Sequence, residues 1–110
     1  MMLSEKLSGY LGFAARARKL QNGYNTTLFL IKKGKAKMVL IAEDAADGTK
    51  DKILQKAKSA GVKAVVFGES DELAHITGNG SGMVFTITDK NFAESISWEI
   101  DRIRSEGVNN

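Results

Sequence analysis

The chain alternates between stretches with helical spacing of apolar residues and short continuous apolar runs. Near the N-terminus apolar residues recur every three or four positions, at Leu3, Leu7, Tyr10, Leu11 and Ala14. Ser4 precedes most of this series and is a suitable N-cap, so residues 4–17 are predicted to form a helix. At the other end of the chain Phe92, Ile96, Ile100 and Ile103 repeat in the same way, which predicts a helix over residues 90–105.

The clearest strand is the apolar run at residues 38–42, in KMVLIAED. An uninterrupted run of this kind is typical of a strand buried on both faces of a sheet. Further strands are predicted within residues 19–23, where the strand is very short, and at residues 62–68 and 83–89. Further helices are predicted from Asn25 as cap to Lys33, from Asp47 or Thr49 to Gly61, and from Ser70 as cap to Gly78.

Regular alternation of helices and strands indicates an α/β fold. Such alternation favours a largely parallel sheet with helices on both faces. The fold class that we predict is a three-layer α/β/α sandwich with a central four-stranded mixed sheet. At 110 residues the chain has the length of one domain, and no proline, linker or repeat divides it, so we expect a single domain over residues 1–110.

Positive charge is concentrated in the first half of the chain. Residues 1–50 have a balance of +5 and residues 51–110 a balance of −2. Between Lys6 and Ala42 there is no carboxylate, and the cations there are Lys6, Arg16, Arg18, Lys19, Lys32, Lys33, Lys35 and Lys37. Two interpretations remain open: a solvated lysine-rich face, or a surface that contacts phosphates.

Catalytic and secretory signals are missing from the sequence. There is no cysteine, and the single histidine, His75, has no nucleophile at a matching position, so we expect a surface histidine and no enzyme. The N-terminus lacks an apolar run long enough for a signal peptide or a membrane span. We therefore expect a cytoplasmic protein that has no membrane partner and needs no cofactor.

Two local motifs resemble ligand sites but have ordinary explanations. Glu43, Asp44 and Asp47 follow the central strand and could bind Mg²⁺, although turn formation and helix capping account for them equally well. GNGSG, residues 78–82, follows a helix and precedes a strand, which is the wrong context for a nucleotide-binding loop. It is either a plain connector or a loop whose backbone can approach a partner closely.

The second helix has two possible inward faces. With Thr27, Leu30, Ile31 and Gly34 inward, Leu28 and Phe29 point partly outward beside cations, as in surfaces that stack nucleobases. With Tyr24, Leu28 and Ile31 inward, Leu28 is buried instead. The pattern does not choose between the two faces.

Three segments carry a family resemblance: LGFAARARKLQNGYN, KKGKAKMVLIAEDA and ELAHITG. They resemble the kink-turn-binding ribosomal protein superfamily of the L-seven-Ae and L-thirty-e type, and its small bacterial YlxQ-like members in particular. The resemblance runs from about Leu7 to Phe92. It implies an α/β/α sandwich that recognises folded RNA, above all kink-turns, through the turn into the second helix and the loop before the last strand.

The resemblance also implies positions for the RNA contacts. Gly23 and Asn25 match the glycine and polar residue that open the second helix, and Glu43 and Asp44 match a strand-end position that the family uses. Lys33, Lys35 and Lys37 match its basic helix-to-strand turn. The loop before the last strand corresponds to Asn79, Gly80, Ser81, Gly82 and Met83.

Two positions depart from the pattern of strong kink-turn binders. Thr26 stands where the family has an acidic residue that accepts hydrogen bonds from guanine, so a charge-assisted contact is missing. Phe29 stands where the family has a lysine, and an aromatic ring can stack on a base but cannot pair with phosphate.

From these observations we expect a non-catalytic protein that binds structured RNA, ribosomal or containing a kink-turn. Arg16, Arg18, Lys19, Lys33, Lys35 and Lys37 are expected to contact phosphates. Asn22, Gly23, Asn25, Thr26 and the loop at residues 79–83 are expected to approach the bases. The alternative is a protein-interaction module on the same fold that uses Leu28, Phe29 or Trp98, since Trp98 lies opposite the inward face of the last helix.

Overall fold

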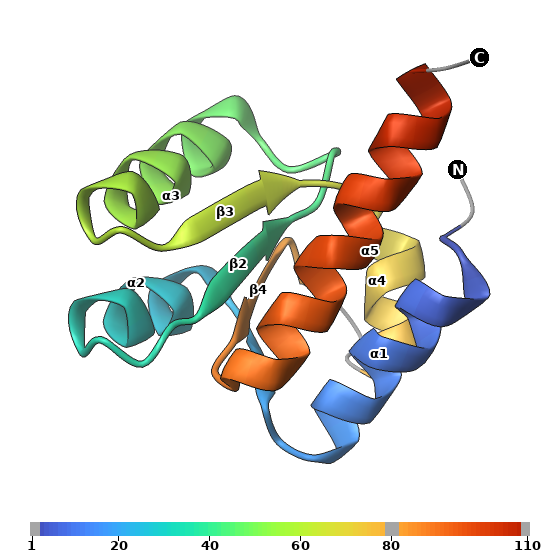
Figure 1. Cartoon of the computed structure of the whole chain (residues 1–110). Coiled ribbons are helices and arrows are strands. Elements are labelled where there is room, and N and C mark those ends of the chain that lie inside the picture. Colours follow the sequence, from blue (N-terminus) through green and yellow to red (C-terminus); the bar gives the residue numbers. More distant parts are fainter. Residues whose placement is uncertain (1–2, 79–81, 109–110) are drawn as a thin grey trace.

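The computed structural model describes residues 3–78 and 82–108, without the side chains of residues 107 and 108. Helices and strands alternate along these residues (Figure 1). In chain order they are α1 (Glu5–Arg16), β1 (Leu20–Asn22), α2 (Tyr24–Lys32), β2 (Met38–Ile41), α3 (Asp47–Ser59), β3 (Lys63–Val66), α4 (Ser70–Thr77), β4 (Val84–Ile87) and α5 (Lys90–Val108).

The four strands form one mixed sheet in the order β1-β4-β2-β3. β2 is parallel to β3, while β4 is antiparallel to both β1 and β2. The mixed α/β sandwich is confirmed, but the expectation of a largely parallel sheet is wrong. The chain leaves β3 and enters β4 at the same end of the sheet, which is the end where β2 finishes. Two hydrogen bonds just after β2 show this: the amide of Glu43 donates to Gly68 O, and the amide of Ala42 donates to Met83 O. β4 therefore runs against its neighbours.

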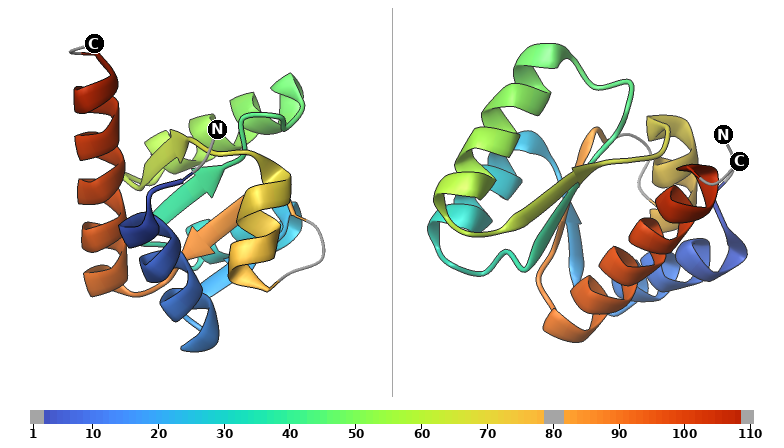
Figure 2. Two further views of the ribbon diagram at one scale, coloured as in Figure 1. Left: turned by 90° about the vertical axis from the view of Figure 1, so that its right-hand side faces the viewer. Right: turned by 45° about the horizontal axis from the view of Figure 1, so that its top comes forward.

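Helices cover both faces of the sheet (Figure 2). Alternate residues of β2 point to opposite sides, so Met38 and Leu40 pack with α1, α4 and α5, whereas Val39 and Ile41 pack with α2 and α3. All four β2 residues are buried. This double burial explains why β2 reads as an uninterrupted apolar run.

The ends of the helices follow local capping chemistry. The hydroxyl of Ser4 accepts a hydrogen bond from Leu7 N, as predicted for the start of α1. Gly78 ends α4 in the left-handed conformation with φ +77°. Two predicted caps are wrong. Helix α2 starts one residue before Asn25 and has Gly23 as its N-cap. Ser70 is the first residue of α4 and not its N-cap, and its hydroxyl donates a hydrogen bond to Asp44 instead of capping the helix.

Candidate nucleic-acid interface

The turn from β1 into α2 lies beside the residues that lead into β4. Gly23 N donates to Val84 O at 2.9 Å, and Ala42 N donates to Met83 O at 2.8 Å. A Cβ placed on Gly82 would lie only 2.8 Å from Nδ2 of Asn22. Segments some sixty residues apart in sequence thus form one surface at this end of the sheet, which we call the turn end: Asn22, Gly23, Asn25, Thr26, Gly82 and Met83.

The first turn of α2 is open at the turn end. Gly23 has φ +121°, a value that favours glycine, and as the N-cap residue it has no side chain with which to cap the helix. Asn25 and Thr26 are exposed. The first backbone N–H groups of a helix have no carbonyl one turn earlier to pair with, and they carry partial positive charge. The turn end therefore offers donors for an anion together with two exposed polar side chains.

A buried hydrogen bond anchors α2 to the sheet. The hydroxyl of Thr86 donates to that of Thr27 at 2.7 Å, and both residues are fully buried. Thr27 and Ile31 form the inward face, with Leu28 and Leu30 half-buried beside them. Of the two faces allowed by the sequence, the one through Thr27 is correct, although Leu28 also packs against the core.

Phe29 is exposed over 55% of its surface, and Lys33 Nζ lies 5.7 Å from the centre of its ring. This geometry is a cation–π contact, which holds the lysine along the ring. Leu28 is half-buried, so an apolar patch around Leu28 and Phe29 consists mainly of one ring that a cation partly covers.

The acidic residues after β2 have partners within the protein. Asp44 accepts hydrogen bonds from Ser70 N at 2.9 Å and from Ser70 Oγ at 2.6 Å. The Ser70 hydroxyl, followed by its amide, lowers the pKa of Asp44 below its usual value. Glu43 accepts from Gly68 N at 3.3 Å. Both residues are exposed, but these bonds give them a structural task in holding the start of α4 against β2.

The predicted phosphate-contacting lysines lie away from the turn end. Lys33, Lys35 and Lys37 follow the C-terminus of α2, about 13 Å along the helix from its first residue. Lys37 N donates to Ile87 O and Thr88 N donates to Lys19 O, so these residues meet where β4 ends. We call this opposite end of the sheet the basic end: Arg18, Lys19, Lys33, Lys35, Lys37 and Lys90, all exposed.

Arg18 connects α1 to the basic end in an unusual backbone conformation. Its φ is +62°, the one positive value at a non-glycine residue in the described ranges. Lys19 N donates to Ala14 O, which closes the C-terminus of α1 in the way that normally uses glycine at the position of Arg18. A left-handed arginine costs of the order of 1 kcal/mol.

Arg16, the last residue of α1, stacks on an aromatic ring. Its guanidinium carbon is 4.8 Å from the centre of the Phe13 ring. A Cβ on Gly12 would lie 3.3 Å from Arg16 Nη1 and 3.6 Å from Ile76 O, so the arginine lies near the end of α4. Phe13, 59% exposed, was missed by the sequence analysis. Phe13 does not belong to the apolar series that forms the inward face of α1, and this could have identified it as an exposed aromatic residue.

Three predicted contact residues, Asn79, Gly80 and Ser81, lie outside the described residues. Within the described ranges, no group of three metal-ligating side chains could hold an ion, and no helix is long and apolar enough to cross a membrane. His75 is exposed on α4, as expected. Trp98 is 68% exposed on α5, opposite the buried Ile96 and Ile100, again as expected.

Relatives of this chain carry RNA-binding names. It is 33% identical over 90 residues to the RNA-binding protein YlxQ of Enterococcus faecium, and these residues cover 82% of this chain and 86% of that protein. It is 31% identical over 86 residues to the RNA-binding protein YlxQ of Bacillus subtilis, covering 78% of this chain and 86% of that one.

Solved structures share the fold. A Bacillus halodurans protein of unknown function superposes with a TM-score of 0.85 at 30% identity, over 90% of this chain and 99% of that one. The Giardia lamblia 15.5kD RNA binding protein superposes with a TM-score of 0.72 at 20% identity, over 94% of this chain and 92% of that one, which supports the fold alone.

A sequence model of one protein family matches residues 5–96, which include every described element except the end of α5. Together with the identity to the two YlxQ proteins, this match shows that the chain belongs to the Ribosomal protein L7Ae/L30e/S12e/Gadd45 family.

Proposed function

We propose that this protein is a non-catalytic RNA-binding protein whose turn end recognises a structured RNA. The observation that carries the proposal is the fixed contact between the β1–α2 turn and the approach to β4, through Gly23 and Val84. The two segments hold exposed polar groups and the first N–H groups of α2 side by side. Such a surface can read base edges and a phosphate together.

The names of the two YlxQ relatives support an RNA ligand. Charge supports it as well, because the chain has a net charge of +3 and its first half supplies five cations of the basic end: Arg18, Lys19, Lys33, Lys35 and Lys37. A sequence-independent attraction to the RNA backbone would then add to the contacts at the turn end.

A kink-turn is the finer target that we propose. Asn25 is exposed in the first turn of α2, where it can reach base edges, and Gly82 lets the backbone before β4 approach Asn22 closely. Thr26 supplies a hydroxyl in place of a carboxylate. We therefore expect a kink-turn to bind more weakly than it would to a protein with an acidic residue at this position.

A binding titration tests both levels of the proposal. A kink-turn RNA and a duplex of scrambled sequence are titrated with the protein over a range of salt concentrations. We expect the kink-turn to bind more tightly than the duplex at every salt concentration. Equal affinities would refute kink-turn recognition, and no binding of either RNA at low salt would refute the RNA proposal itself.

Matched variants locate the recognition surface. Asn25→Ala should weaken binding of the kink-turn more than binding of the duplex, because a base contact is lost. Gln55→Ala makes a similar change at an exposed position of α3 and should leave both affinities unchanged. An equal loss for both RNAs with Asn25→Ala would mean that Asn25 does not read the structured target.

A further inference from the structure

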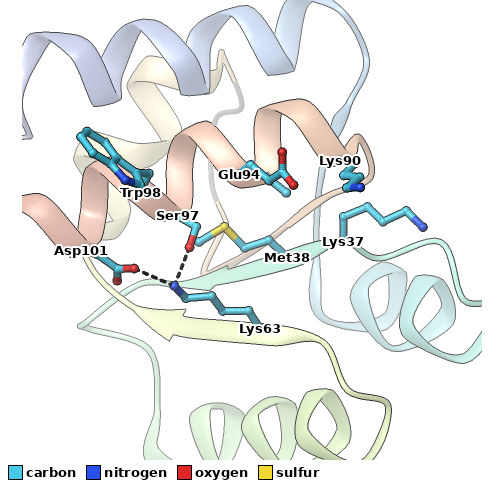
Figure 3. A pocket seen from close by; sticks show the side chains of 9 residues that line it. Lys37, Met38, Lys63, Lys90, Glu94, Ser97, Trp98 and Asp101 are labelled. Atoms are coloured by element: carbon cyan, nitrogen blue, oxygen red, sulfur yellow. Dashed lines mark hydrogen bonds and ion pairs between the residues drawn. The ribbon is translucent and has the colours of Figure 1, made fainter.

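An open hollow of about 530 Å³ lies between α5 and the start of β2 and β3 (Figure 3). Its floor is apolar, formed by the buried residues Met38 and Ala93. Trp98 stands at one end of the hollow, and Lys37 and Lys90 lie at the other end. An exposed aromatic ring and two cations thus share one concave surface, away from the turn end.

The charges around the hollow are unevenly paired. Lys63 Nζ is 3.0 Å from Asp101 Oδ2 and 2.5 Å from Ser97 Oγ, so the charges of Lys63 and Asp101 offset each other. Lys37 and Lys90 form no ion pair with any carboxylate in the described ranges. They also belong to the basic end, whose cations extend the positive surface beyond the hollow.

We propose that this hollow binds an unpaired RNA segment, with a base stacked on Trp98 and phosphates at Lys37 and Lys90. The inference rests on the proposed RNA-binding function and adds a second contact surface to it. Stacking on an exposed indole needs a base whose face is free, which selects single-stranded RNA over a duplex.

The dimensions fit a short strand. Lys90 and Trp98 are eight positions apart on α5, or about 12 Å along the helix axis. At about 3.4 Å per stacked nucleotide, this span corresponds to three or four nucleotides. Glu94 lies between the ring and the two lysines (Figure 3). Because its carboxylate repels phosphates, we place phosphates only at the lysine end. The carboxylate then faces base edges that can donate hydrogen bonds to it.

A protein ligand fits this hollow less well. Lysine is depleted in protein–protein interfaces, and three lysines line this surface. The same composition is favourable for RNA, where lysines neutralise phosphates and an exposed aromatic ring can stack on a base.

Trp98 provides a direct test, because it is the only tryptophan in the chain. Its fluorescence is followed while a short oligouridylate is added, and then while an abasic ribose-phosphate oligomer of the same length is added. We expect saturable quenching by the oligouridylate and little quenching by the abasic oligomer. Quenching of the same size by both oligomers would overturn base stacking.

Variants connect the signal to the lysines. Lys37→Ala and Lys90→Ala should each weaken the affinity measured by quenching. In the parent protein, where both lysines contact phosphates, this affinity should fall about sevenfold as the salt concentration rises from 50 to 200 mM. Lys58→Ala, the same change at an exposed position of α3, and Asn25→Ala should leave the quenching affinity unchanged. If Lys37→Ala and Lys90→Ala also leave it unchanged, the phosphate placement is wrong.

The role of the ring is tested separately with a labelled oligouridylate, followed by polarisation. Trp98→Leu should weaken its binding roughly 5- to 150-fold, the range for one lost stacking contact. Glu94→Gln should strengthen it up to about fivefold, because the variant removes a negative charge that repels the phosphates at the lysine end and keeps an amide oxygen that can accept from base edges. Unchanged affinity in Trp98→Leu would overturn the inference.

Failure of this inference can be distinguished from failure of the proposed function. If the kink-turn RNA binds in the titration but the oligouridylate neither quenches Trp98 nor binds, the turn end functions alone and this inference is wrong. A change in Trp98 emission with protein concentration alone, together with a dimer in sedimentation, would show that a second copy covers the ring, which would also overturn it.

Discussion

The amide nitrogen of Gly23 donates a hydrogen bond to the carbonyl oxygen of Val84 at 2.9 Å, joining the start of α2 to the start of β4. The two residues are 61 positions apart, yet this bond fixes the relative position of the two segments proposed to read RNA. Gly23 adopts φ +121°, so its amide can turn toward β4 without the strain that a side chain would add. The turn end is therefore largely formed before RNA binds.

Gly82→Ala should damage this arrangement. Its Cβ would meet Nδ2 of Asn22 at 2.8 Å and Cζ of Phe85 at 3.3 Å, so the Asn22 side chain, the Phe85 ring or the backbone before β4 must shift. We expect a loss of about 1 to 3 kcal/mol in stability, as for other overpacked sites, and weaker kink-turn binding in a titration.

Gly9→Ala is the matched control. Gly9 lies in the middle of α1, and a Cβ at this position would have no neighbouring atom within 4 Å. It should stabilise the protein by about 0.5 to 1 kcal/mol and leave RNA affinity unchanged. Kink-turn affinity equal to that of the parent protein in Gly82→Ala would show that the close approach to Asn22 is not needed for binding.

Thr26→Glu should strengthen kink-turn binding. The side chain is exposed in the first turn of α2, where a carboxylate can accept hydrogen bonds from guanine and also complements the helix dipole. A new charge-assisted contact of about 1.5 to 3 kcal/mol corresponds to a gain in affinity of roughly 12- to 150-fold.

Thr49→Glu makes the same change of charge in the first turn of α3 and controls for general repulsion of RNA. It should reduce affinity slightly for every RNA. If Thr26→Glu weakens kink-turn binding as much as Thr49→Glu does, the bound kink-turn presents no guanine edge at position 26, and the proposed contact there is wrong.

Local chemistry made much of the fold predictable. The central strand was evident because Val39 and Ile41 face one core while Met38 and Leu40 face the other, which leaves no polar alternation. The caps at Ser4 and Gly78 were also correct, since both depend on residues within one turn. Strand direction was not predictable in this way, because an apolar run has the same pattern whichever way the strand runs.

The candidate site was harder to predict because it depends on distant partners. Ser70 resembled a helix cap, but its hydroxyl bonds to Asp44, 26 residues earlier. The lysines after α2 were expected to act with Asn25, yet the length of the helix puts Lys33 at the opposite end of the sheet. Periodicity identifies the face of a helix on which a residue lies, but not the neighbours at its ends.

Lys33→Ala tests whether bound RNA reaches from the turn end to the basic end. If a phosphate lies at Lys33, the variant should weaken binding of all RNAs and reduce the salt slope by about 0.9 for a duplex contact. Lys58→Ala removes the same charge from an exposed position of α3 and should leave the slope unchanged. If Lys33→Ala has the same salt slope as the parent protein, the bound RNA does not reach Lys33 and contacts the turn end alone.

Glu99 should contribute stability that depends on pH. Its carboxylate is buried and accepts hydrogen bonds from Arg102 at 2.5 Å and from the Ser4 hydroxyl at 2.9 Å. Chiefly through Arg102, and against the opposing effect of burial, these partners lower its pKa from 4.5 to about 2. A carboxyl whose pKa falls on folding stabilises the protein fully above its unfolded value, here about pH 4.5, and loses that contribution as the pH falls toward 2.

Glu99→Gln should therefore cost about 1.5 to 3 kcal/mol in denaturant unfolding at neutral pH, the range for a hydrogen bond to a charged group. The deficit relative to the parent protein should shrink as the pH is lowered from about 4.5 toward 2. Glu106→Gln is the control, because Glu106 pairs with the same Arg102 but is exposed, and it should cost at most about 1 kcal/mol. A deficit for Glu99→Gln that stays constant down to pH 2 would mean that the lost stability comes from packing at the α1–α5 contact and not from the charge of Glu99.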